Sequence, residues 1–114
     1  MSEPPDWAES WIPEAKITGY LLSDATPKAR ARRRFFMDRG FSPEEPQLLM
    51  AALMDHLRLA DTRILSRSDQ HGRTFVVQAR IAAPDGSEPI IRSYWIVRAD
   101  SARPQLTTVI PGGS

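Results

Sequence analysis

Apolar and polar residues alternate along two segments in the second half of the chain. In residues 74–83, one face of an extended chain carries Phe75, Val77, Ala79 and Ile81. In residues 90–98, one face carries Ile91, Ser93, Trp95 and Val97. A period of two residues is typical of a strand with one buried face, so both segments are predicted strands. Pro-Asp-Gly-Ser at 84–87 predicts the turn between them.

Shorter segments flank this predicted hairpin. Residues 62–68 predict a first strand, and residues 105–110 predict a last strand after Pro104. The pattern leaves two points open: whether strand 62–68 lies at the edge or in the centre of the sheet, and which face the helices cover.

The first half of the chain has helical periodicity. A short helix is predicted from Pro13, with an apolar side formed by Ile17, Tyr20, Leu21 and Leu22. In the second predicted helix Thr26 is the expected N-cap, Pro27 the first helical residue and Gly40 the C-terminal stop.

A third helix is predicted to begin at a capping box formed by Ser42 and Glu45 and to run to about Ala60. Leu49, Leu53 and Leu57 follow at intervals of four residues. Pro46 lies close enough to this start to displace it by a few residues.

Helices followed by an antiparallel meander predict an α+β fold, with about three N-terminal helices packed on a sheet of about four strands. We expect residues 1–11 to form a flexible acidic arm, 12–111 a single domain and 112–114 a tail. Trp7 and Trp11 are unusual in a free arm, and we expect them to cover the domain or a partner subunit.

Composition narrows the function classes. The net charge of +1, from 15 basic and 14 acidic residues, argues against a protein that coats DNA. The absence of cysteine excludes disulfides, thiolate catalysis and cysteine-based zinc sites. Two histidines, unpaired acids and the lack of a nucleotide-binding motif predict neither a metal nor a cofactor. No signal peptide or membrane-spanning segment is apparent, so a cytoplasmic protein without membrane contact is expected.

Residues 28–34 contain five basic side chains and precede two phenylalanines. A solvated helix surface is the expectation for Lys28, Arg30, Arg33 and Arg34. Arg32 differs, because it precedes Phe35 and Phe36 by three and four residues and so borders the apolar face. Two roles stay open for Arg32: a side chain that extends to solvent, and a bidentate ligand for phosphate or carboxylate.

A second group of candidates lies on the predicted sheet. Arg80 and Arg92 belong to neighbouring strands, on a face expected to carry also Gln78, Tyr94 and Thr108. Such a row can bind an anion or single-stranded RNA, and it can equally be a plain polar surface.

The two histidines are expected in different surroundings. His71, in the loop Asp-Gln-His-Gly-Arg, is either a general base or a polar turn residue. His56 lies beside Leu53 and Leu57 on the third predicted helix, where a partly buried structural role is expected rather than catalysis.

The order of short motifs resembles a family of small bacterial domains of unknown function. The resemblance rests on Tyr-Leu-Leu at 20–22, Thr-Pro with the later Phe-Phe at 26–36, Pro-Asp-Gly at 84–86, the Arg and Trp of 92–96, and Pro-Gln-Leu-Thr-Thr-Val-Ile-Pro at 104–111. The family pattern has a lysine at the position that Arg32 occupies in this chain. Its arginine, tryptophan and later threonine correspond to Arg92, Trp95 and Thr108. It has histidine where this chain has Thr26, and a hydroxyl cannot act as an acid or base near neutral pH.

The resemblance implies a fold loosely similar to ribonuclease toxins of the barnase and RelE type, by analogy of fold alone. An active version would hold a phosphate with Arg32 and Arg92, bind it with Thr108, and transfer protons with His71 or Tyr94. Two hypotheses remain, and they leave open whether the protein is an enzyme. The first is an anion- or RNA-binding, toxin-like protein. The second is a non-catalytic interaction module, either antitoxin- or immunity-like or a homodimer built on the sheet edge and the tryptophan arm.

Overall fold

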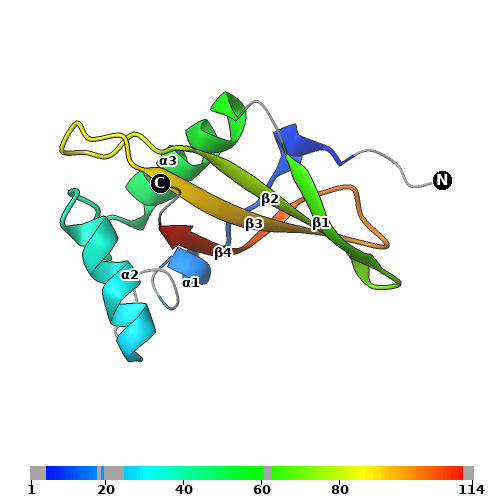
Figure 1. The fold of residues 1–114 in the computed structure, drawn as a ribbon, viewed down its shortest axis with the longest axis horizontal. Coiled ribbons are helices and arrows are strands. Elements are labelled where there is room, and N and C mark those ends of the chain that lie inside the picture. Colours follow the sequence, from blue (N-terminus) through cyan, green and yellow to red (C-terminus); the bar gives the residue numbers. More distant parts are fainter. Residues whose placement is uncertain (1–4, 18, 20–24, 61–62, 112–114) are drawn as a thin grey trace.

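The computed structural model describes residues 5–17, 19, 25–60 and 63–111. In this part of the chain, helices pack on a four-stranded antiparallel sheet with the order β1-β2-β3-β4, as predicted (Figure 1). The strands are β1 (Ile64–Asp69), β2 (Gly72–Arg80), β3 (Ile90–Arg98) and β4 (Gln105–Pro111). The helices are a 3₁₀ turn (Trp7–Glu9), α1 (Glu14–Lys16), α2 (Pro27–Met37) and α3 (Pro46–Leu59). Tyr20, Leu21 and Leu22 lie outside the described residues.

The structure settles the two open points about the sheet. The strand predicted over 62–68 is β1, which lies at an edge and is exposed along its whole length. The helices cover the face that carries Val77, Ile91, Trp95, Val97, Leu106 and Val109, all of them buried. The core forms where this inner face meets α3, whose Leu49, Leu53 and Leu57 are also buried. The opposite side of the sheet is its outer face.

Helix α2 begins as the sequence predicts. Thr26 has an extended backbone, and its Oγ1 accepts a hydrogen bond from the Ala29 N–H at 3.0 Å. The chain leaves the helix through Gly40, whose φ of 100° suits glycine. A Cβ atom at Gly40 would lie 2.9 Å from the Pro84 Cβ, so the helix end approaches the β2–β3 loop closely. The Asp85 N–H donates to the Arg39 carbonyl at 3.1 Å, which fixes α2 to that loop.

The predicted start of α3 is wrong by three to four residues. Ser42 does not cap the helix, because its Oγ accepts from the Glu44 N–H two residues later, at 3.1 Å. Pro46 explains the difference: the residue before a proline is disfavoured in the helical region, and Glu45 has φ −131° and ψ 64°. The helix therefore begins at Pro46, where the missing N–H breaks no intrahelical bond.

The tryptophans of the N-terminal segment pack on the domain itself. Trp7 makes edge-to-face contacts with Phe75 and Trp95, with ring centroids 5.4 and 6.5 Å away. The Arg63 guanidinium lies 4.8 Å from the centroid of the Trp7 ring. Trp11 exchanges backbone hydrogen bonds with Pro104 and Leu106 at 2.8 and 3.0 Å, so the segment covers the start of the β4 edge.

Because Thr26 caps a helix and Ser42 does not, alanine variants at the two positions should differ. We expect T26A to lower the free energy of unfolding by about 1 kcal/mol, the usual cost of losing an N-cap. S42A should cost only a few tenths of a kcal/mol, since an exposed turn bond is replaced by water. Urea unfolding of both variants measures the difference. An equal or larger cost for S42A would contradict the assignment of caps.

Candidate binding face

The outer face of the sheet lies opposite α3, and all four strands contribute to it. The register of the strands places the following side chains on it: Ile64 and Arg67 of β1, Thr74, Val76, Gln78 and Arg80 of β2, Ile90, Arg92, Tyr94, Ile96 and Arg98 of β3, and Gln105, Thr108 and Ile110 of β4. The more extensive contacts between helices and the sheet are those of α3 with β2 and of α2 with β4. In Figure 1 the ribbon of α3 runs along one side of the sheet, and α2 stands off one end of it.

Side chains on this face form rows that cross the strands. One row, running through Ile64, Val76, Tyr94 and Thr108, spans all four strands. In the next row Arg92 lies between Gln78 and Ile110. Arg80 lies two residues from Gln78 on β2, diagonal to Arg92, a spacing that long side chains bridge. The sequence therefore predicted correctly that Arg80, Arg92, Tyr94 and Thr108 share one face.

Arg32 and Thr108 meet in a groove between α2 and β4. The groove has a volume of about 610 Å³ and is lined by Lys28, Ala31, Arg32, Phe35, Thr108, Val109, Ile110 and Pro111. It adjoins the outer face at Ile110, which pairs with Arg92 on the neighbouring strand. Arg32 is half-buried beside Phe35, as its position along the helix predicts.

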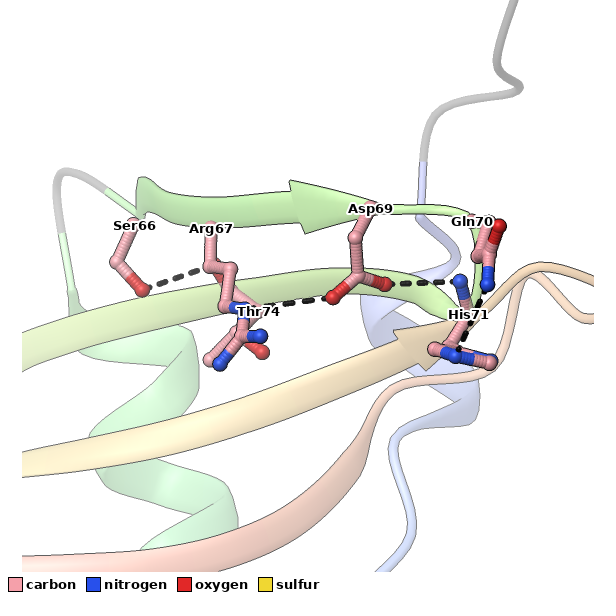
Figure 2. Close-up of polar contacts among 6 residues, drawn as sticks. All are labelled: Ser66, Arg67, Asp69, Gln70, His71 and Thr74. Carbon is pink, nitrogen blue, oxygen red and sulfur yellow. Dashed lines mark hydrogen bonds and ion pairs between the residues drawn. The ribbon is translucent and has the colours of Figure 1, made fainter.

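His71 lies apart from these residues, at the tip of the β1–β2 hairpin (Figure 2). Asp69 accepts the His71 backbone N–H at 2.8 Å and lies 3.3 Å from the Arg67 guanidinium. The hydrogen bond from His71, with the Arg67 charge as a smaller cause, lowers the pKa of Asp69.

The distance of His71 from Arg92 follows from the pairing of β2 with β3. Gly72, the next residue, pairs with Arg98, and Arg92 lies six residues farther along β3. At about 3.3 Å per residue, Arg92 is about 20 Å from the hairpin tip. His71 and Arg92 therefore do not act on one small substrate in this arrangement.

A buried polar network links α3 to the centre of the sheet. His56 and Ser93 are 1% and 0% exposed. The His56 Nε2 lies 2.8 Å from the Ser93 Oγ, and its Nδ1 lies 3.2 Å from the Arg80 carbonyl oxygen. The Trp95 Nε1–H donates to the same Ser93 Oγ at 2.8 Å.

A neutral His56 ring with its proton on Nδ1 satisfies every group in this network, and the Ser93 hydroxyl has the Val77 carbonyl, at 3.5 Å, as a more distant second acceptor. The carbonyl of Arg80 can only accept, so the His56 Nδ1 carries the proton and donates. The Ser93 Oγ accepts from Trp95 and donates its own proton to the His56 Nε2. Burial lowers the pKa of His56, which agrees with a neutral ring. The histidine and serine resemble a catalytic pair in composition, but neither is exposed to a substrate.

Sequence reasoning predicted a partly buried structural His56, whereas the structure buries the side chain completely, and it missed the partner of His56. Ser93 shares a face with Ile91, Trp95 and Val97, and a polar residue in the middle of an apolar row was the available signal.

The described residues contain no group of three or more His, Asp or Glu side chains able to hold a metal ion. Over the same residues, no helix is long and apolar enough to cross a membrane.

The family of the chain follows from its sequence pattern. The domain of unknown function DUF6883 matches residues 4–113. The chain belongs to the DUF6883 family. This agrees with the predicted resemblance to an uncharacterised domain family. Among curated proteins, none matches this DUF6883 chain.

A solved structure shares the fold. It is described as a contact-dependent growth inhibition toxin–immunity protein complex from Klebsiella pneumoniae 342. One of its chains is similar to this DUF6883 domain with a TM-score of 0.72, over 90% of this chain and 100% of that chain. The sequence identity is 14%, so the similarity concerns the fold alone.

The buried His56 should make the stability of the domain depend on pH. In the unfolded chain a histidine takes up a proton near pH 6.5, whereas burial lowers the pKa of folded His56. Below about pH 6.5 the unfolded state therefore binds more protons, and the free energy of unfolding falls as the pH drops. The pKa values of Asp69 and Asp85 are also lowered, but their protonation changes the free energy of unfolding only below about pH 4.

Urea unfolding between about pH 7.5 and 5 tests this dependence. H56Q should lose most of the slope below pH 6.5, because glutamine does not titrate there. H71Q, which removes the exposed histidine at the hairpin tip, is the matched control and should keep the wild-type slope. The assignment fails if H56Q and wild type have the same pH dependence.

Proposed function

We propose that this DUF6883 domain is a non-catalytic protein-recognition module, one member of a pair of proteins of the toxin–immunity kind. The observation that carries the proposal is the outer face of the sheet, which no described helix covers. A sheet normally buries at least one face and exposes the other only when that face is polar. Here the exposed face also carries large apolar side chains.

The composition of the outer face is that of an interface. Ile64, Ile110 and Ile90 are 63%, 43% and 38% exposed. Tyr94 is half-buried in the row of Ile64, and Ile96 is half-buried one row farther along β3. Ile110 and Ile90 lie in the rows of Arg92 and Arg80, so arginines adjoin the apolar side chains. Aromatic and arginine side chains are enriched in protein interfaces and contribute most to affinity. Monomeric proteins seldom expose such residues together without a partner.

The positions of the two histidines support recognition rather than catalysis, and of the predicted acid–base groups Tyr94 alone shares the outer face with Arg92. General acid–base catalysis requires the group within hydrogen-bond reach of the reacting atom. His71 lies about 20 Å from Arg92 along the sheet, and His56 with Ser93 is sealed in the core. The similarity in fold to a chain of a toxin–immunity complex is consistent with a paired protein.

A second candidate function, binding of RNA or another phosphate ligand, is favoured by the groove between α2 and β4. Lys28 and Arg32 bring two positive charges to this groove, which Thr108 also lines. If it holds a phosphate, R32A should weaken binding of a short RNA by about tenfold, the usual effect of losing a charge-assisted bond. R34A, which removes an exposed arginine of the same helix, is the control. Equal effects of the two variants, measured by fluorescence anisotropy at low salt, would exclude a specific phosphate site.

The main proposal predicts that a protein reaches the outer face inside the cell. A photo-crosslinking amino acid placed at Tyr94 should form a covalent product with one protein, which mass spectrometry identifies. The same amino acid at Leu48, an exposed position on α3, should not form that product. Binding should then be reproduced with the two purified proteins and lost in I96D, which puts a charge in the centre of the face.

The outcomes separate the candidate functions. A crosslink to a second copy of the chain would support the homodimer form of the interaction module. Crosslinks to RNA alone, or equal products from Tyr94 and Leu48, would contradict the proposal.

A further inference from the structure

We infer that the partner of the outer face is an acidic protein surface, with an apolar centre between two groups of carboxylates. This inference rests on the proposed function and specifies the chemistry of the partner. Its basis is the distribution of charge over the four strands.

The strands carry more positive than negative charge, and Glu88, just before β3, lines a pocket together with Arg80. Asp69 is the one acidic residue in β1 to β4, and it already pairs with Arg67 at 3.3 Å. Arg80, Arg92 and Arg98 are exposed, and no hydrogen bond or ion pair joins their guanidinium groups to a described residue. Exposed guanidinium groups with five N–H donors each are suited to binding carboxylates in pairs.

The arginines lie at the two ends of the apolar centre. Arg92 and Arg80 occupy adjacent rows near one end of the sheet, and Arg98 lies opposite Gly72 at the other. Arg98 follows Arg92 by six positions along β3, which corresponds to about 20 Å. Tyr94 and Ile96 fill the space between them. A complementary surface therefore has carboxylates about 20 Å apart with apolar side chains between.

A nucleic acid fits this face less well than a protein. Sheets that bind single-stranded RNA stack bases on several exposed aromatic rings. The outer face has one ring, that of Tyr94, which is half-buried between Val76 and Thr108. Its other large side chains are isoleucines, which offer no ring for stacking and pack readily against apolar protein side chains.

A second copy of the chain does not supply the carboxylates. If two outer faces pack on each other, the arginines of one lie against a face with more arginines than acids: Asp69 is already paired, and Glu88 lines a pocket together with Arg80. Like charges brought together at an interface oppose association. The partner is therefore a different protein surface.

Three probes of defined composition test the inference. The first is an acetylated peptide with two glutamates at each end and six alternating valine and threonine residues between, which spans about 20 Å when extended. The second has glutamine in place of every glutamate, and the third is a ten-nucleotide oligouridine. Backbone amide chemical shifts of the isotope-labelled domain report where each probe binds and how tightly.

We expect the glutamate peptide to shift the amides of β2 and β3 and to bind at least tenfold more tightly than the glutamine peptide. R92E should weaken this binding by about tenfold, because it reverses one charge of the face. R34E is the matched control, since it reverses an exposed charge on α2 away from the face, and it should bind as wild type does.

Two results would overturn the inference. One is tighter binding of oligouridine than of the glutamate peptide. The other is the absence of outer-face shifts up to about 1 mM peptide, a concentration at which even a millimolar dissociation constant gives measurable binding. If either occurs while Tyr94 still crosslinks to a protein, the acidic partner is wrong and the recognition module stands. If the crosslink is also absent, the proposed function fails as well.

Discussion

The hydrogen-bonded attachment of α3 to one face of the sheet is the constraint on which the rest of the structure depends. His56 reaches from the helix to Ser93, and Ser93 also receives the Trp95 indole N–H. A buried polar group without partners is costly, so the three side chains stabilise one relative position of helix and sheet. With α3 fixed on the inner face, the outer face stays uncovered, and its alternate residues become the surface of the protein.

Most of the fold could be predicted because local signals agreed with the tertiary structure. Alternation in β2 and β3 separated the two faces of the sheet correctly, because one face packs on helices and the other does not. Alternation alone did not show which of the two faces the helices cover. Thr26 followed by Pro27 marked the start of α2. The start of α3 was wrong because two local signals competed: Ser42 resembles a cap, but Pro46 prevents Glu45 from being helical.

The candidate site was predictable only in part. Strand parity was enough to place Arg80, Arg92 and Tyr94 together, because neighbouring antiparallel strands keep side chains in rows. Parity could not show that His71 lies at a distant hairpin tip, since that depends on strand length and register. The meeting of Arg32 with Thr108 across a groove depends on where α2 packs, which follows from tertiary contacts such as that of Asp85 with Arg39.

The central proposal is that the outer face of the sheet recognises a protein and does not catalyse a reaction. Overproduction of the intact protein in a bacterial host, followed by growth rate and the integrity of total RNA, tests this claim most directly. The account predicts normal growth and intact RNA for wild type and R92A alike. Growth arrest with cleaved RNA in wild type, and recovery of both in R92A, would show that the arginine face supports catalysis and would contradict the account.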